Sequence, residues 1–220
     1  MFHPEVKSKI DEDICILIKL DNHPWNYLCE CGDASDLTVK EIQNVNAIFI
    51  SHTHIDHFVN FDTILRHQIG VQRGVLICGP KGIAGQVQSR IKSYTWNLID
   101  KNAIRYEIRE LVSENEIHIF EVEPPAWELK KKGVIHTNTI FEENTFAVTA
   151  ILLNHKIPTL AYKFKEQDTT RIDIQASGFK GGKWVKELKE AFEENEPSRI
   201  ISTEGNDYKA SELFHLLRIH

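Results

Sequence analysis

Residues 47–61, AIFISHTHIDHFVNF, place three histidines and one aspartate within six positions. They are His52, His54, Asp56 and His57, and they follow an apolar run typical of a buried strand. Neutral imidazole and carboxylate are ligands that zinc takes in proteins. Because side chains alternate along an extended segment, His52 and His54 point to the same side and can share one ion.

The segment continues into a pattern of helical spacing, so we expect the chain to turn into a helix here. Asp56 and His57 then reach a second ion, roughly 3.5–4 Å from the first as in hydrolytic two-metal sites. The alternative is a run of hydrogen-bonded histidines at a helix start, with Asp56 as the helix cap. The density of ligand-type residues favours the metal site.

Strands alternate with helices in the first part of the chain. Residues 38–41, TVKE, have the form of a capping box, which marks the start of a helix. Gly70 is expected to end the helix that precedes it. The expected strands are 14–20, 25–31, 47–51 and 75–79. A short helix is expected to begin near residue 38, and two longer ones at 58–70 and 82–94. This β-α-β-α order predicts a layered α/β fold with the histidines at a strand-to-helix junction.

Later segments read as consecutive strands, which predicts an antiparallel portion of sheet. These strands are 103–111, 116–123, 145–155 and 159–165. From residue 166 the amino-acid composition changes, with a glycine-rich stretch at 177–184 and an expected charged helix at 186–195. A short strand at 199–203 and an amphipathic helix at 210–220 follow.

Composition restricts the class of protein. The 220 residues carry a formal net charge of −6, are 41% hydrophobic, and suit one domain with a sizeable core. The negative charge disfavours a generic nucleic-acid or membrane-surface binder, although a local basic patch is compatible with it. The absence of an 18-residue apolar run or a secretory leader predicts a cytoplasmic protein without membrane contact. The four cysteines (Cys15, Cys29, Cys31, Cys78) are expected as reduced thiols.

The H-x-H-x-D-H motif behind a strand resembles the signature of the metallo-β-lactamase fold hydrolases. Within them, the chain most resembles ribonuclease Z, the endonuclease that trims tRNA 3′ ends. Three further segments carry this likeness: LCECGDAS, CGPKGI and LLNHKIPTLAYKF. The resemblance covers residues 14 to about 190 and implies a four-layer αββα fold whose second half is incomplete.

The resemblance also implies roles for single residues. His52, His54 and His155 would bind the first metal, and Asp56 and His57 the second. Asp56 would also orient the attacking water or accept its proton. Glu30 stands where the family has Asp, and would orient a ligand by accepting a hydrogen bond. The expected cofactor is zinc, one or two ions, with manganese as the other metal.

The resemblance divides the chain into a core, residues 1–165, an arm-like insertion, 166–196, and the start of the remaining part of the same domain, 197–220. The family's arm grips tRNA, so the insertion would contact RNA; the alternative is a solvated helix with one anchored Trp. The candidate contacts in the arm are Lys180, Lys183, Trp184, Lys186 and Lys189.

A bridging aspartate and a last histidine of the family are not visible in the sequence. We therefore expect a truncated copy, a fragment, or a second half supplied elsewhere, with a weak second metal site. His215 is expected on the face of the last helix rather than as a substitute ligand. An open strand edge after residue 203 would favour a homodimer.

The function expected from these residues is metal-dependent cleavage of an RNA phosphodiester, at the tRNA 3′ end, by a metal-bound hydroxide. Two alternatives stay open. One is a hydrolase of the same superfamily acting on a small ester, thioester or lactam. The other is a non-catalytic remnant that folds and binds metal.

Overall fold

The computed structural model describes residues 1–167 and 170–219. The chain divides into two compact units, Met1–Lys165 and Glu166–His220. Each unit has its own hydrophobic core, so each is a separate packing unit.

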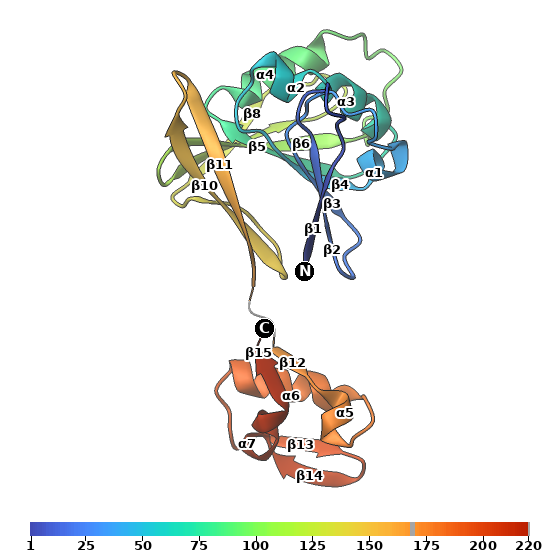
Figure 1. Ribbon diagram of the computed structural model, residues 1–220, viewed down its shortest axis with the longest axis vertical. Coiled ribbons are helices and arrows are strands. Elements are labelled where there is room, and N and C mark those ends of the chain that lie inside the picture. Colours follow the sequence, from blue (N-terminus) through green and yellow to red (C-terminus); the bar gives the residue numbers. More distant parts are fainter. Residues whose placement is uncertain (168–169, 220) are drawn as a thin grey trace. The chain divides into compact units, whose positions relative to one another are not determined.

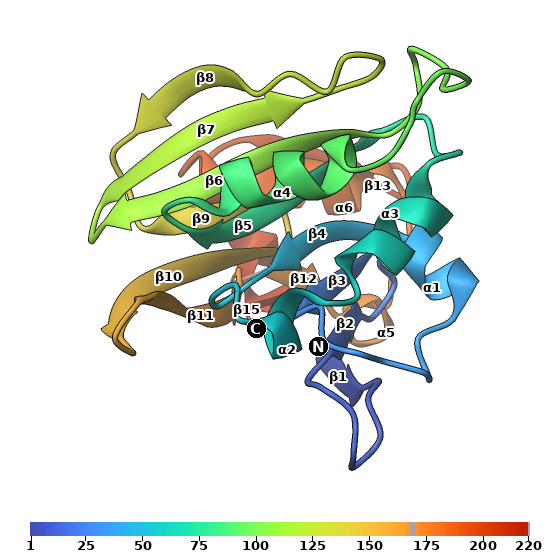
Figure 2. The same ribbon diagram turned by 90° about the horizontal axis from the view of Figure 1, so that it is seen from above.

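The first unit contains an eight-stranded sheet in which the strands lie in chain order (Figures 1 and 2). The central strands β3 to β6 pair in parallel, and the flanking strands pair antiparallel. The eight strands are β1 (Phe2–Val6), β2 (Ile16–Leu20), β3 (Asn26–Cys29), β4 (Val45–Phe49), β5 (Gly74–Pro80), β6 (Arg105–Ser113), β7 (Glu116–Val122) and β8 (Lys130–Ile135). The mixed sheet, with its antiparallel portion, confirms the pattern read from the sequence.

Four helices belong to this unit. They are α1 (Val39–Gln43), α2 (Ile55–Phe58), α3 (Phe61–Gln68) and α4 (Ile83–Lys92). The expected capping box is present on α1, where Thr38 accepts from the Glu41 N–H and Glu41 accepts from the Thr38 N–H. Burial alone would raise the pKa of Glu41, but hydrogen bonds from Lys7, Thr38 and Lys19 outweigh it and lower that pKa to about 2.

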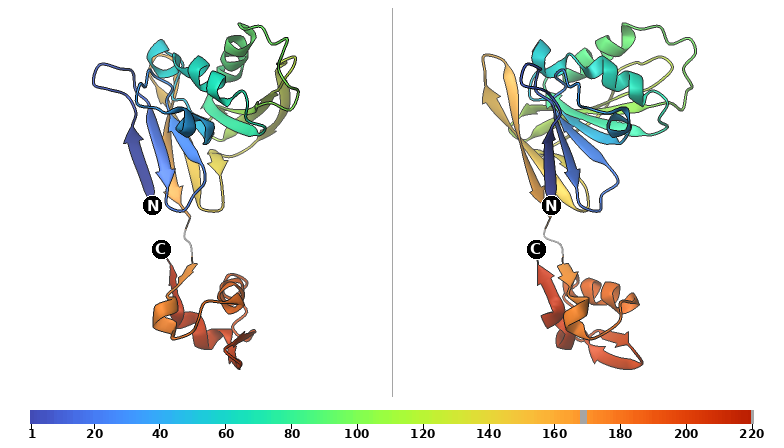
Figure 3. Two further views of the ribbon diagram at one scale, coloured as in Figure 1. Left: turned by 90° about the vertical axis from the view of Figure 1, so that its right-hand side faces the viewer. Right: turned by 45° about the vertical axis from the view of Figure 1, so that its right-hand side comes forward.

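A second sheet of three strands completes the first unit. Its strands are β9 (Thr139–Glu142), β10 (Phe146–Asn154) and β11 (Pro158–Glu166), with β10 in the middle. The helices lie on one face of the large sheet and the small sheet faces its other side (Figure 3). Between Arg105 and Lys165 the chain forms strands and no helix, so the described first unit has three of the four expected layers.

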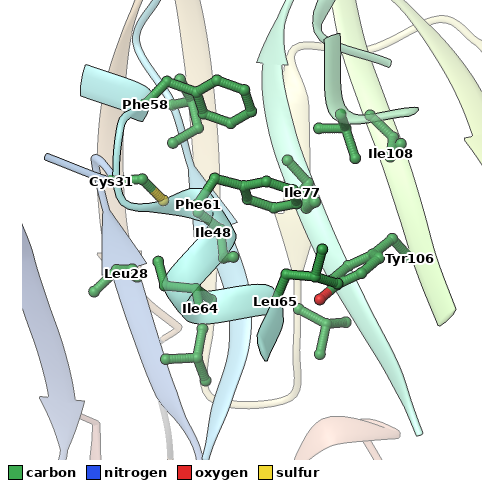
Figure 4. Close-up of a cluster of buried hydrophobic side chains, with 14 of the residues drawn as sticks. Leu28, Cys31, Ile48, Phe58, Phe61, Ile64, Leu65, Ile77, Tyr106 and Ile108 are labelled. Carbon is green, nitrogen blue, oxygen red and sulfur yellow. The ribbon is translucent and has the colours of Figure 1, made fainter. Parts of the chain in front are cut away.

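Alternation along the central strands builds the two cores of this unit. From β4 into the residue after it, Ile48 and Ile50 pack toward the helices, whereas Ala47 and Phe49 pack toward the small sheet. The helix-side core contains Phe61 of α3 among strand residues, as Figure 4 shows. A strand buried on both faces reads as a continuous apolar run, which is why residues 47–50 lack polar alternation.

Some helices and strands were not predicted from the sequence, or begin and end at other residues than expected. The helix expected at 58–70 is split into α2 and α3, because Val59 and Asn60 interrupt it. Strands β1, β8 and β9 were not predicted. Both β1 and β8 lie at the margin of the sheet, are mostly exposed and have no fully buried residue, so their apolar signal is weak.

The second unit contains two small two-stranded sheets and three short helices. Its elements are β12 (Thr170–Ile172), α5 (Ile174–Ser177), α6 (Lys183–Glu193), β13 (Ile200–Thr203), β14 (Asn206–Lys209), α7 (Ala210–Leu213), a 3₁₀ turn (Phe214–Leu216) and β15 (Leu217–Ile219). Trp184 and Leu188 of α6 share one core with Ile201 and Leu213. Residues 197–220 therefore pack with 166–196 in this unit; the assignment of an arm within a larger domain stays a prediction.

The prediction of an amphipathic helix at 210–220 was wrong. Only α7 and the 3₁₀ turn are helical, and β15 pairs antiparallel with β12. Strand pairing with a distant segment and burial of Leu217 override the local helical pattern. His215 lies in the 3₁₀ turn, and His220 lies outside the described residues.

Candidate metal centre

The histidine motif begins where β4 leaves the large sheet. The Ile50 N–H donates to the Cys78 carbonyl as the last link to β5, and α2 then begins at Ile55. The strand-to-helix junction expected from the sequence is confirmed. His54, not Asp56, occupies the N-cap position, and it makes no side-chain cap hydrogen bond. Asp56 is therefore not the helix cap that the alternative interpretation required.

Three imidazoles converge at this junction. One ring nitrogen from each of His52, His54 and His155 lies within 4.8 Å of the others. The first two come from the end of β4, whereas His155 comes from the turn between β10 and β11, so the cluster joins the two sheets. His52 is buried, and the other two are exposed to solvent.

Hydrogen bonds orient His52 within the cluster. Its Nδ1 lies 2.9 Å from the Ser51 hydroxyl, which leaves Nε2 facing His54 Nδ1 at 3.0 Å. Burial, followed by the neighbouring histidines, lowers the pKa of His52. A lowered pKa keeps the imidazole neutral, which is the form that binds a metal.

Asp56 and His57 form a second pair beside these three. Asp56 Oδ2 lies 3.3 Å from His57 Nε2, and the ring centroids of His57 and His52 are 4.1 Å apart. Neither residue belongs to the convergent group of three. The structure thus brings together Asp56 and His57, the two candidate ligands of the second metal.

Glu30 lies under this pair in a left-handed backbone conformation, with φ of 65°. Both of its carboxylate oxygens are 3.2 Å from the Ser51 N–H. Its Oε2 is also 3.2 Å from His57 Nδ1, but without hydrogen-bond geometry, so that buried nitrogen has no hydrogen-bond partner. Burial raises the pKa of Glu30, against the opposing effect of Ser51 and His57.

Backbone hydrogen bonds connect the loop after Glu30 to α2 and to the residues that follow α2. The Cys31 N–H donates to the His57 carbonyl, and the Asn60 N–H donates to the Cys31 carbonyl, both at 2.9 Å. The next residue must be glycine, since a Cβ at Gly32 would lie 2.5 Å from the Ile14 carbonyl oxygen. Close backbone contact therefore holds the loop that supports His57.

The three convergent residues fit a metal ion. They offer three nitrogens of the type that zinc binds, within a span that one ion can bridge, and His52 already has the outer hydrogen bond that orients such ligands. A catalytic zinc site has three protein ligands and one open position. Asp56 and His57 alone would hold a second ion less firmly.

An open cavity of about 590 Å³ adjoins the cluster. It is lined by His54, Asn154, His155, Lys156 and Ile157. Lys156 has a positive φ, and its N–H donates to the Asn154 side-chain oxygen. The sequence analysis did not single out Lys156, although a cation directly after a candidate ligand is a usable signal for an anionic substrate.

A second open cavity, of about 640 Å³, lies between the histidine loop and α4. Thr53, Ile55 and Gly82 are among its lining residues. At its edge the buried Glu110 carboxyl accepts the N–H groups of Gly82 and Ala84, at 3.0 and 2.9 Å. The amino end of α4 is thereby hydrogen-bonded within the protein.

The candidate RNA contacts of the second unit fall into two groups. The ring of Trp184 is 3% exposed and its N–H donates to the Lys180 carbonyl, so it serves as an anchor of the unit's core and presents no open face. Lys183 and Lys186 are exposed on α6, each paired with a glutamate one turn later. Lys180 and Lys189 complete the predicted lysines, and contact of these lysines with RNA stays a prediction.

No protein-family model matches the chain. The first unit's fold is that of the metallo-β-lactamase proteins, shown by likeness to the crystal structure of human tRNase Z, short form. That match has a TM-score of 0.51 at 18% identity, and covers 76% of this chain and 64% of that one.

In sequence the chain is similar to ribonuclease Z. It is 28% identical to ribonuclease Z of Deinococcus radiodurans over 77% of this chain and 54% of that protein. It is 27% identical to ribonuclease Z of Methanocaldococcus jannaschii over 74% of this chain and 46% of that protein. The chain thus spans about half the length of these relatives.

Proposed function

We propose that the protein is a metal-dependent hydrolase that cleaves RNA phosphodiesters at the 3′ end of precursor tRNA, acting in the cytoplasm. The observation that carries this proposal is the convergence of His52, His54 and His155 from two sheets. The similarity to proteins named ribonuclease Z supports the choice of substrate.

The three imidazoles would hold the metal, which we propose to be zinc, with manganese as a substitute. A bound ion there would supply a Lewis acid that lowers the pKa of water and neutralises charge on phosphate oxygens. Ser51 keeps the His52 ring turned so that Nε2 faces the site. Asp56, which is 54% exposed at the rim, is the carboxylate available to accept a proton.

Lys156 supports a phosphate substrate over a neutral ester. It is the one basic side chain among the residues lining the cavity beside His54 and His155. A cation at this place attracts a phosphodiester and offers nothing specific to a lactam or a simple ester. The lysines of α6 would add a second, weaker contact with RNA because glutamates partly offset their charge.

The test combines metal content with cleavage. Purified protein should carry about one zinc per chain by elemental analysis, because one three-imidazole group is present among the described residues. With added zinc or manganese it should shorten a precursor tRNA that has a 3′ extension, and His54→Ala should abolish both properties.

Two results would contradict the proposal in different ways. Absence of metal from both the wild type and His54→Ala would remove the metal site. If the protein binds metal and hydrolyses small esters but does not cleave RNA, the proposed metal site stands and the proposed RNA substrate is wrong. The homodimer expected from the sequence stays a prediction, and light scattering of the same preparation would measure it.

A further inference from the structure

The β11 strand makes polar links from the small sheet to the large sheet directly behind the histidines. The Tyr162 hydroxyl lies 2.7 Å from the Ile50 carbonyl oxygen and 3.1 Å from the Cys78 carbonyl oxygen. Two residues earlier, the Leu160 N–H donates to the Ser51 carbonyl at 2.9 Å. These bonds hold the two residues that precede His52.

The Tyr162 hydroxyl takes the place of a missing strand partner. The ladder between β4 and β5 ends with the Ile50 N–H bonded to Cys78, so the next carbonyl, that of Ile50, has lost its partner in the ladder. Ile50 is fully buried, and a buried carbonyl requires a hydrogen bond. Burial holds the pKa of Tyr162 well above its usual value, so its hydroxyl keeps the proton that it donates.

Other polar links join the two sheets through β9 and the turn after it, such as the bond that Arg109 donates to the Ile140 carbonyl. The contact next to Tyr162 itself is apolar and aromatic. The ring of Tyr162 packs against Phe49 with centroids 5.4 Å apart, and Phe164 packs against the same ring at 5.1 Å. Apolar packing is non-directional, so it holds two sheets together without fixing how one slides along the other. Directional hydrogen bonds fix that register.

Register decides the metal geometry, because His52 and His54 follow β4 of the large sheet and His155 lies in the turn between β10 and β11 of the small one. We propose that Tyr162 is a positioning residue that sets the distance between His155 and the other two imidazoles, and thereby the affinity of the site for metal. This inference rests on the proposed metal site.

The experiment compares Tyr162→Phe with Tyr106→Phe. Tyr106 is a matched control because it is fully buried and its hydroxyl donates to Gln68 at 3.0 Å, in the core on the helix side. Both variants lose one buried hydrogen bond, so the unfolding midpoint of the metal-free protein should fall in both. Zinc affinity, measured by competition with a chelator of known affinity, should fall roughly 10- to 100-fold only in Tyr162→Phe, the range for losing a group that orients ligands.

Wild-type zinc affinity in Tyr162→Phe would overturn the positioning role, as would an equal loss in both variants. Failure of the wild-type protein to bind zinc would instead refute the proposed function, and the inference with it. The two failures are therefore distinguishable.

Hydrogen exchange on the wild type tests the same idea if Tyr162→Phe does not fold. Coupling between sites is reciprocal, so a link that favours zinc binding must be strengthened by zinc. Zinc should slow exchange of the Leu160 amide, whereas the amide of Tyr106 serves as the internal reference and should change little. Protection confined to the histidine segments, with no change at Leu160, would reject the inference.

Discussion

Replacing His155 with alanine removes the only contribution of the small sheet to the proposed metal site. The side chain is exposed on the turn after β10, and it makes no contact that the fold needs. We therefore expect His155→Ala to change the free energy of unfolding of the metal-free protein by less than about 0.5 kcal/mol, as for other surface positions. Its effect should appear in metal binding alone.

The size of that effect follows from the number of ligands. Structural zinc sites with four protein ligands bind with apparent free energies of about 10–16 kcal/mol, or roughly 2.5–4 kcal/mol for each ligand. At tenfold for every 1.4 kcal/mol, losing one of the three imidazoles should weaken zinc binding on the order of 10²- to 10³-fold. Both His155→Ala and His54→Ala should therefore lose their zinc on dialysis.

The assay is elemental analysis after dialysis, followed by titration with zinc against a competing chelator. His3→Ala is the matched control, since His3 is half exposed on β1 and pairs with Asp21 outside the cluster. If His155→Ala keeps its zinc while His54→Ala loses it, His155 is not a ligand, and the convergence seen in the structure has no functional meaning.

Three further predictions concern the stability of the first unit. Gly32→Ala should lower the free energy of unfolding by about 1–3 kcal/mol in chemical denaturation, because its Cβ would collide with a backbone carbonyl. Gly133→Ala, which has open space around it, should change it by less than about 0.5 kcal/mol. Glu41→Gln should remove a stabilisation that is present above pH 4.5 and is lost as the pH falls toward 2, on the order of 1 kcal/mol after solvent screening. Denaturation at pH 7 and pH 3 would reveal it, and a pH dependence equal to that of the wild type would contradict the assignment. Glu110→Ala should cost about 1–3 kcal/mol by leaving two helix N–H groups unbonded, and thermal unfolding with no loss would refute that capping role.

The sequence predicted the parts of the fold that depend on local patterns. The junction before His52 was readable because a continuous apolar run meets a helical period, and α1 because Thr38 and Glu41 form a capping box. The last helix was mispredicted because β15 forms through pairing with β12, a segment about 45 residues away along the chain. Long-range pairing leaves no mark in local periodicity.

The candidate site shows the same limit. The spacing of His52 and His54 was enough to predict them as metal ligands. His155 could be predicted only from the family resemblance, because no local pattern indicates that its turn meets the end of β4. Neither Tyr162 nor Lys156 was singled out beforehand. A tyrosine in a strand reads as core, and its bond to the Ile50 carbonyl exists only once the two sheets are packed.

The buried Glu110 at the start of α4 bears on how a charged polymer would approach the molecule. The amino end of a helix usually attracts phosphate, through free N–H groups and the helix dipole. Here an internal carboxyl takes the Gly82 and Ala84 N–H groups, and Arg90, the basic residue that lines the cavity on that side, is paired with Asp62 at 2.8 Å. The cavity at His155 contains Lys156 instead. The two sides of the histidine cluster therefore differ in charge, with a paired cation on one side and Lys156 on the other.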